Sequence, residues 1–274
     1  MITFAPVKRL SLLLFSGLIF HVANSQTTSG RWLKGMYLQW GYNVEAYTHS
    51  NIHFKMSNGD DFILHQARAH DRNDFDDIYK ETSQISIPQY NYRIGFYLDT
   101  KHSRAVELNF DHAKYIVTDG QTVHVTGTID GVHVDGDSVL NPATFLHFEH
   151  TDGANWLHFN YVRLYHLAYT KSHSRTLLTG LWKAGAGINI PRTDFTWKGD
   201  RLNNDFHIAG YNISAEGGFR FYPLKKFFLE GTGKTGYVRY IDALANTTTA
   251  KGNRASQGFM YAEAIFTLGY EFNF

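Results

Sequence analysis

The end of the chain, Met260 to Phe274, constrains the fold more than any other stretch. Its even-numbered positions are all apolar or aromatic, whereas the odd-numbered positions from Glu263 onward are mostly polar. Strict alternation over more than about ten residues is typical of a β-strand with one apolar and one polar face. A soluble sheet would bury the apolar face, but here the chain stops on an aromatic residue, which leaves no following residue to cover it. We therefore predict a strand whose apolar face contacts lipid rather than a buried sandwich strand.

The same stretch resembles the terminal strand that bacterial outer-membrane barrels present to their assembly machinery. The resemblance rests on a glycine followed by three aromatic residues, which are Gly269, Tyr270, Phe272 and Phe274. It implies that these four residues form an assembly signal and that the barrel assembly machinery is a partner during insertion.

Seven earlier segments alternate in the same way, and together with the last they predict eight strands. The segments are 35–49, 89–99, 105–115, 156–169, 177–190, 209–221 and 226–240. The connections alternate between three short ones (100–103, 170–175 and 223–225) and four long ones (50–88, 116–155, 191–205 and 241–257). Short periplasmic turns and long extracellular loops are typical of outer-membrane barrels. The predicted fold is all-β, a transmembrane antiparallel up-and-down β-barrel of eight strands, or of ten if 61–69 or 144–150 also spans.

One residue breaks the alternation. Arg163 falls on the nominally apolar face of the segment 156–169. We expect a β-bulge or a short register shift to account for it.

The first 25 residues have the pattern of a signal peptide. Lys8 and Arg9 precede an apolar run over 10–20, and Ala23-Asn24-Ser25 has the small-x-small pattern of a cleavage site. The run is too short to span a bilayer as a helix. We expect cleavage after Ser25 and a single barrel domain over 26–274. Because an exported chain without spanning helices can enter a membrane only as a barrel, we expect the outer membrane of a Gram-negative bacterium.

Composition excludes several classes of function. The net charge is only +1, so no global electrostatic argument favours nucleic acid as a partner. Cysteine is absent, which removes disulfides, thiolate catalysis and a lipid anchor on a processed cysteine. Aromatic residues make up 16% of the chain, as the aromatic girdles of a membrane barrel require.

The polar faces of the predicted strands carry charges of both signs. An eight-stranded barrel encloses a lumen just wide enough for side chains to fill, and unpaired charges inside it are costly. The inward charges that we place are Glu45, Glu107, Asp111, Glu216, Glu230, Glu263 and Glu271 against Arg93, Lys183, Arg220 and Lys234. The turn at 223–225 sets two strands side by side, which predicts the lumen ion pairs Arg220–Glu230 and Glu216–Lys234. We interpret the charges as a structural plug, with a proton-linked or ion pathway as the alternative.

Most of the histidines, His158 among them, map to the outer half of the strands or to the long loops. Imidazole and carboxylate together suit zinc and other divalent ions. The spacing is not diagnostic, because His147 and His150 on one strand point to opposite faces. We expect no metal site and no cofactor.

A short stretch near the end of the first strand supplies an enzymatic alternative. His49-Ser50-Asn51 resembles the His-x-Ser-Asn region of lipid A deacylases, which are also eight-stranded barrels. The resemblance implies a serine that is activated by histidine and attacks a lipid ester. Here His49 and Ser50 are adjacent and lie in the first strand, whereas the family separates them by one residue and carries them late in the chain. Both residues therefore depart from the family's catalytic pattern.

Across residues 26–274 the sequence resembles small outer-membrane β-barrel proteins of the Bacteroidota type, among the eight-stranded barrels similar to OmpA, OmpW and PagL. The segments 87–95 and 110–115 carry most of the resemblance. It implies outer-membrane lipid and lipopolysaccharide as surroundings, and other outer-membrane proteins as partners through the long loops. The hypothesis that follows is a non-enzymatic barrel with a structural or interaction role, such as that of an accessory subunit of a larger outer-membrane complex. The alternatives are a lipid A-modifying hydrolase and a small-solute channel.

Overall fold

The computed structural model describes residues 33–74, 89–172 and 174–274. Residues Leu33–Phe274 form one compact unit, and every regular element among the described residues is a β-strand. No helix in the described part of the chain is long and apolar enough to cross a membrane. The predicted signal peptide over 1–25 and the start of the segment 87–95 lie outside the described residues.

Eight antiparallel strands close into a ring. They are β1 (Gly35–Tyr47), β5 (Tyr90–Tyr97), β6 (Arg104–Asp111), β11 (Trp156–Tyr169), β12 (Thr176–Asn189), β15 (Gly210–Phe221), β16 (Phe227–Leu244) and β17 (Arg254–Asn273). Each pairs with the next in this order, and β17 pairs back to β1 from Tyr47↔Tyr261 to Gly35↔Asn273. The prediction of an eight-stranded antiparallel barrel is therefore confirmed. The segments 61–69 and 144–150, which a ten-stranded barrel would need, lie outside the ring.

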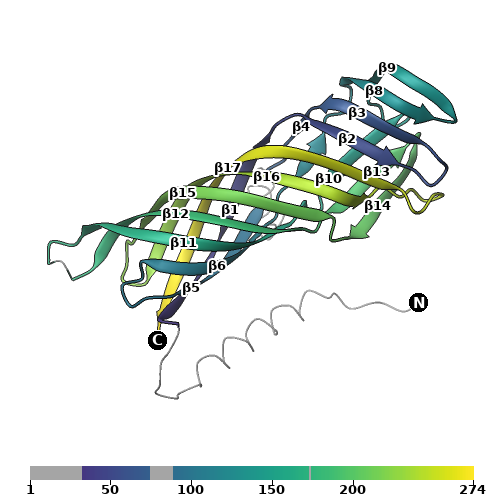
Figure 1. The fold of residues 1–274 in the computed structure, drawn as a ribbon. Helices are drawn as coiled ribbons and strands as arrows, with labels where there is room; N and C mark the ends of the chain where they lie inside the picture. Colours follow the sequence, from purple (N-terminus) through teal and green to yellow (C-terminus); the bar gives the residue numbers. More distant parts are fainter. Residues whose placement is uncertain (1–32, 75–88, 173) are drawn as a thin grey trace, which may run out of the picture. The chain divides into compact units, whose positions relative to one another are not determined.

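Short turns join the ring strands at one end, and further strands fill the long connections at the other end (Figure 1). We call these additional strands the outer section: β2 (Ser50–Lys55), β3 (Asp61–Ala67), β4 (Ala69–His70), β7 (Tyr115–Val117), β8 (Thr122–Ile129), β9 (Val132–Val139), β10 (Leu146–His150), β13 (Arg192–Trp197) and β14 (Asp200–Phe206). The expectation of a long loop at 241–257 is wrong. The strands β16 and β17 run on past the ring and leave only 245–253 as the connection, because their outer ends continue to pair with each other.

The strand β17 belongs to both parts of the molecule. Its inner portion closes the barrel against β1, whereas its outer portion, Arg254 to Gln257, pairs with β2. The sheet then continues through β3 and β8 to β9. A second sheet, in the order β14-β13-β10-β7-β4, completes the outer section.

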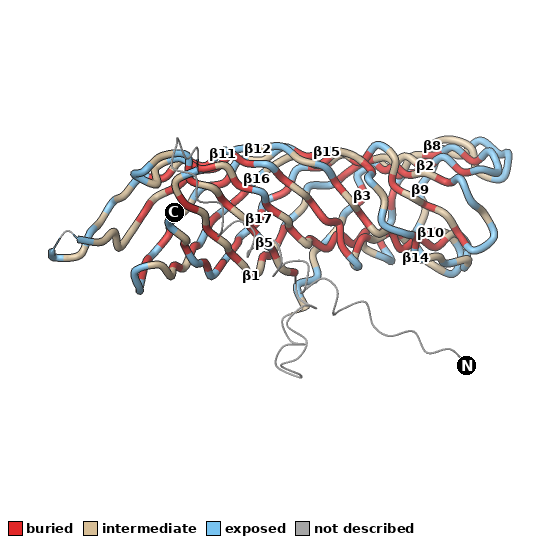
Figure 2. Tube along the Cα trace, turned by 90° about the horizontal axis from the view of Figure 1, so that it is seen from below, coloured by how far each residue is buried: buried red, intermediate tan, exposed pale blue. Residues whose placement is uncertain are grey.

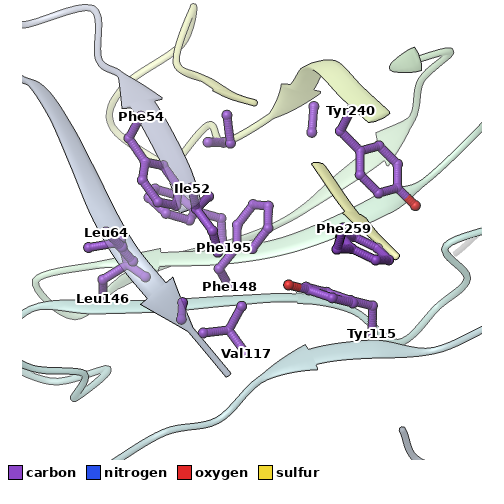
Figure 3. Close-up of a cluster of buried hydrophobic side chains, with 14 of the residues drawn as sticks. Ile52, Phe54, Leu64, Tyr115, Val117, Leu146, Phe148, Phe195, Tyr240 and Phe259 are labelled. Carbon is purple, nitrogen blue, oxygen red and sulfur yellow. The ribbon is translucent and has the colours of Figure 1, made fainter. Parts of the chain in front are cut away.

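Hydrophobic side chains of the outer section form a core between its two sheets (Figure 3). The Phe54 ring of β2 stacks on Phe195 of β13 at 5.5 Å and meets Phe148 of β10 edge-on at 5.4 Å. The Phe62 ring of β3 stacks on Trp197 of β13 at 5.1 Å. These ring pairs join strands that are far apart in sequence, so the long connections form a packed body rather than irregular loops.

Buried and exposed residues alternate along the barrel strands (Figure 2). The exposed positions are apolar over most of the ring and include Leu108, Phe159, Tyr161, Trp182, Ile213, Phe219, Met260 and Phe266. Arg163 also faces outward, which corrects the expectation of a register change beside it. It pairs in regular register with Arg104 and Trp182 near the turn end, and the bulge of β11 lies beyond it, between His166 and Ala168. Its guanidinium lies 5.5 Å from the Tyr165 ring centre, where an aromatic girdle accommodates a cation.

Candidate functional site

The barrel interior is the most heavily charged part of the molecule. All eleven inward charges placed from the sequence are buried, with at most 8% of any residue exposed. Because successive side chains of a strand point to opposite faces, the apolar exterior forces these polar residues inside. Seven of the eleven are acids and four are bases, so the interior holds three more carboxyl groups than cations.

Six of these residues form what we call the acid–base cluster, which consists of Arg93, Glu107, Lys183, Glu216, Arg220 and Glu230. The Arg93 guanidinium Nη1 lies 2.6 Å from Glu216 Oε1. The Lys183 ammonium lies 2.8 Å from Glu230 and 3.1 Å from Glu107. Each carboxylate thus contacts at least one cation, which offsets the desolvation that burial imposes on both partners.

The two predicted lumen ion pairs have different outcomes. Arg220 and Glu230 lie directly opposite each other on β15 and β16, and Nε donates to Oε2 at 2.8 Å. Glu216 and Lys234 also lie directly opposite each other. Glu216 nevertheless forms its ion pairs across the lumen with Arg93 and with Lys183, at 2.6 and 3.3 Å. Long side chains in a narrow closed barrel reach strands that are not neighbours, so register alone does not determine the partner.

Lys234 belongs to a second group, nearer the outer section. Its ammonium contacts Asp111 of β6 and lies 3.2 Å from Glu263 Oε2 of β17. His158 of β11 lies 3.2 Å from the same ammonium and 3.5 Å from Asp111. The sequence placed His158 with the outer histidines, but it faces into the lumen because it shares the inward parity of β11.

A cluster of buried hydrophobic residues lies between the charges and the short turns. It contains Tyr37, Tyr97, Ala105, Val162, Leu164, Leu181, Tyr222 and Phe228. The Arg220 guanidinium lies 4.0 Å from the Phe228 ring centre and 4.5 Å from that of Tyr37. Gly95 makes room for Tyr37, since a Cβ on Gly95 would lie 1.9 Å from a Tyr37 ring carbon. We call this group the turn-end cluster.

The core of the outer section lies at the other end of the charged interior. Its members nearest the lumen include Trp156, Tyr240 and Tyr261. Trp156 packs on Tyr261 with ring centres 4.5 Å apart, and its indole N–H donates to the Tyr240 hydroxyl at 3.2 Å. The ion pairs therefore lie between two hydrophobic clusters, one contributed by each end of the barrel.

The residues of the hydrolase alternative point in opposite directions. Ser50 is buried, and its hydroxyl lies 3.0 Å from the Tyr115 hydroxyl and 3.2 Å from Gln257 Oε1. His49 is exposed. Adjacent residues of an extended chain face opposite sides, so His49 is not placed to take a proton from Ser50.

The four residues of the predicted assembly signal lie at the end of β17 or directly after it. Gly269 faces inward under Phe228, whose ring occupies the space of a Cβ at 2.2 Å. Tyr270 and Phe272 lie two residues apart on the apolar face, with ring centres 4.9 Å apart. The predicted role of Gly269, Tyr270, Phe272 and Phe274 in assembly stays a prediction.

Two histidines of β10 occupy contrasting surroundings. The His147 ring lies 2.9 Å from Asp119 and 3.3 Å from Glu149. Burial opposes its charged form, but hydrogen bonds to Glu149 and Asp119 outweigh burial and raise the pKa of His147 to about 9. His150 is fully buried beside Phe148 and Tyr240, and burial lowers its pKa to about 3. Within the described ranges, no group of three or more histidine and acidic side chains could hold a metal ion.

Comparisons with known proteins give likeness of fold only. No protein-family model matches the sequence, and no curated protein matches it. The chain is similar to the outer membrane protein OprG from Pseudomonas aeruginosa, with 12% identity, 89% of this chain and 99% of that chain covered, and a TM-score of 0.42. It is also similar to the attachment invasion locus protein Ail of Yersinia pestis, with 9% identity, coverage of 88% and 100%, and a TM-score of 0.32. It is similar as well to the outer membrane protease OmpT from Escherichia coli, with 8% identity, coverage of 90% of this chain and 99% of that chain, and a TM-score of 0.31. At these identities and TM-scores, none of the three assigns a function to this chain.

The location follows from the surface of the barrel itself. The ring satisfies its backbone hydrogen bonds through strand pairing on both sides, and its exposed side chains are apolar over most of the surface. Such a surface is stable in hydrocarbon and not in water, and closed antiparallel barrels of this kind are the spanning structures of outer membranes. The protein is an integral β-barrel of a Gram-negative outer membrane.

Proposed function

We propose that this barrel is not an enzyme and that it has a structural or interaction role, in which the outer section is the surface presented to partners. One observation carries the proposal: the charged interior is filled by ion pairs and lies between two hydrophobic clusters. Ion pairs across the lumen favour a structural role over a substrate site or a solute pathway inside the barrel. The surface left for recognition is the exterior of the outer section.

That exterior is polar and held in a defined shape. On the sheet β2-β3-β8-β9, His53 lies 2.5 Å from Asp61. His124 lies between Asp135 and Asp137, at 3.0 and 3.2 Å. The aromatic core beneath fixes β2 and β3, Val123 and Val125 of β8 pack on the same core, and β9 is held by its pairing with β8. A partner would therefore bind a preformed surface at little cost in conformational entropy.

The partners that we propose are lipopolysaccharide around the apolar exterior of the barrel and another outer-membrane protein on the outer section. In this proposal the chain is an accessory subunit. The sequence resemblance to small barrels of the Bacteroidota type supports the same class. The barrel assembly machinery remains a proposed partner during insertion. The test is crosslinking in intact outer membranes, followed by purification in mild detergent. A partner that is lost from the triple variant H124A/D135A/D137A would support the proposal, and a chain that purifies alone from crosslinked membranes would contradict it.

The hydrolase alternative predicts a different result. Lipid A from cells with and without the gene should have the same mass spectrum if the barrel is not an enzyme. Loss of an acyl chain that depends on the gene and disappears in the Ser50→Ala variant would overturn the proposal. Ser50→Ala leaves the barrel interior unchanged, because Ser50 bonds to Tyr115 and Gln257 in the outer section.

A further inference from the structure

The excess of acids in the barrel interior is concentrated at one place. Arg93, Lys183 and Arg220 are engaged by carboxylates of the acid–base cluster, which leaves Lys234 as the cation that contacts Asp111 and Glu263, and Glu45 lies opposite Glu263 in the β1–β17 register. An ionised carboxylate without a partner in a closed interior is costly. Three carboxyl groups around one ammonium therefore require a further positive charge.

Two of these acids face each other across the seam that closes the barrel. Glu45 of β1 and Glu263 of β17 are directly opposite in the antiparallel register, and both are buried. Side chains in such positions have Cβ atoms about 4.5–5.5 Å apart, and like charges there are destabilising. The seam therefore favours a state in which the two groups do not both carry a charge.

The hydrogen bonds of the pair indicate the same state. Glu45 Oε1 accepts from Asn43, but Glu45 Oε2 and both carboxylate oxygens of Glu263 have no donor among the described residues. Lys234 Nζ lies 3.2 Å from Glu263 Oε2 without the geometry of a hydrogen bond, and it is held by Asp111. A proton on either carboxyl group would supply a donor among these three acceptors.

We propose that Glu45 and Glu263 together bind one proton, which joins the two carboxyl groups by a hydrogen bond across the β1–β17 seam. The charged and titratable groups around the pair come from several strands. They are Lys234 of β16, Asp111 of β6, Arg93 of β5, Glu216 of β15, Asp71, Tyr47 of β1 and Tyr261 of β17, and His158 of β11 contacts Lys234 and Asp111. Lys234 and Arg93 favour ionisation of the pair, whereas Asp71, Asp111 and Glu216 oppose it.

The proton exchanges with the outer side of the membrane. Among the described residues, β1 pairs with β5 as far as Tyr42 and the Asn43 amide donates to the Gln89 carbonyl at 3.3 Å, after which the Glu45 amide donates to Asp71 Oδ2 at 2.9 Å. Asp71 follows β4 in the outer section and is partly exposed. The Asp71 carboxyl group also lies beside the Glu45 carboxyl group, so we place the route of proton exchange with external water there. Loss of the proton leaves two negative charges opposed in the seam, so alkaline conditions loosen the outer end of the β1–β17 pairing.

Infrared spectroscopy of the protein in lipid vesicles tests the proposal. Wild type at neutral pH should show the carbonyl stretching band of a protonated carboxylic acid, and this band should disappear at alkaline pH. The double variant E45Q/E263Q should lack the band and should still fold, because two amides can hydrogen-bond to each other in the same positions. Absence of the band in wild type, or its persistence in the double variant, would overturn the proposal.

Unfolding midpoints provide a second readout with a matched control. Glu45→Gln and Glu263→Gln each replace one oxygen by a donor, so each should leave the midpoint at neutral pH unchanged. Glu230→Gln, at similar burial, removes a charge that three cations contact and should lower the midpoint clearly. Folding of each variant is verified by heat-modifiable migration on gels. If the single or double variants of the pair are as destabilised as Glu230→Gln, or do not fold, the shared proton is excluded.

Discussion

The barrel and the outer section are built from the same kind of paired strands, yet their interiors are opposite in character. The barrel encloses ion pairs, and the outer section encloses aromatic rings. The strand β17 passes through both and changes pattern as it does so. Its inward residues include Glu271 and Glu263 in the barrel, Tyr261 at the outermost pair with β1 and Phe259 beyond that pair, whereas its outward residues change from Phe266 to polar ones such as Ser256.

The interiors of the barrel and the outer section differ because different solvents surround the two parts. Hydrocarbon around the barrel requires an apolar exterior, which leaves polar side chains to fill the lumen. Water around the outer section favours burial of apolar side chains. The two faces of β17 exchange character near Met260 and Tyr261, and we expect the outer boundary of the hydrocarbon core near this level.

The largest effect is expected for loss of a shared charge inside the barrel. Glu230→Ala removes the carboxylate that contacts Arg93, Lys183 and Arg220. Leaving buried cations short of a partner should cost about 3–5 kcal/mol of folding free energy. Reversible urea unfolding in lipid vesicles measures this cost. The matched control is Thr232→Ala on the same face of β16, whose hydroxyl has no hydrogen-bond partner among the described residues and should matter little. Equal effects of the two substitutions would contradict the ionic account of the barrel interior.

A similar or somewhat smaller loss of stability is expected for a substitution in the core of the outer section, and this loss should be confined to the outer section. Leu64→Ala leaves a cavity beside Ile52 and Leu146 in the aromatic core and should cost about 2–5 kcal/mol. Limited proteolysis should then cleave the outer section, while the barrel keeps its heat-modifiable migration. The neighbouring Ile63→Ala, on the outer face of β3, is the control and should have a smaller effect. Collapse of the barrel together with the outer section would show that the two regions are not separable.

The smallest effect is a pH dependence confined to the outer section, with opposite signs for two residues of β10. The pKa of His150 is lowered from 6.5 to about 3 by burial, so its contribution to stability is fully present above pH 6.5 and is lost progressively as pH falls from 6.5 towards 3. The pKa of His147 is raised to about 9, so its contribution is present below pH 6.5 and is lost as pH rises through 9.

Proteolytic sensitivity of the outer section as a function of pH measures both contributions. His150→Phe should remove the acid sensitivity, because a phenyl ring fits the apolar core without a proton to bind. His147→Gln should remove the alkaline loss and leave the acid limb in place. If His150→Phe instead removes the alkaline loss, or His147→Gln removes the acid sensitivity, the two environments on β10 are misassigned.

The barrel could be predicted from the sequence because its signal is long and simple. Alternation over eight to twenty residues predicted every ring strand, and the same parity placed the inward charges. The partners of those charges were harder to predict. Glu216 pairs with Arg93, which is 123 residues away in sequence, because the closed ring brings β5 and β15 within reach across the lumen. The register of neighbouring strands does not determine which side chains meet across the lumen. Those contacts depend on how the ring closes.

The packed core of the outer section was not predicted, for a different physical reason. Its strands are two to eight residues long, too short for alternation to stand out among the glycines and polar residues of the long connections. A signal was present in pairs such as Ile52 with Phe54 and Phe62 with Leu64, which place two apolar residues on one face. Such pairs become strands only because the opposite sheet supplies Phe148 and Phe195 to pack against.

Single-channel recording in planar bilayers tests most directly whether the barrel interior is sealed. Protein whose folding has been verified by heat-modifiable migration is inserted, and current is recorded over a range of voltages. Ion pairs held between the turn-end cluster and the core of the outer section predict no conductance steps above the bare bilayer. Reproducible steps from the wild-type protein would contradict the sealed interior and would favour the small-solute channel.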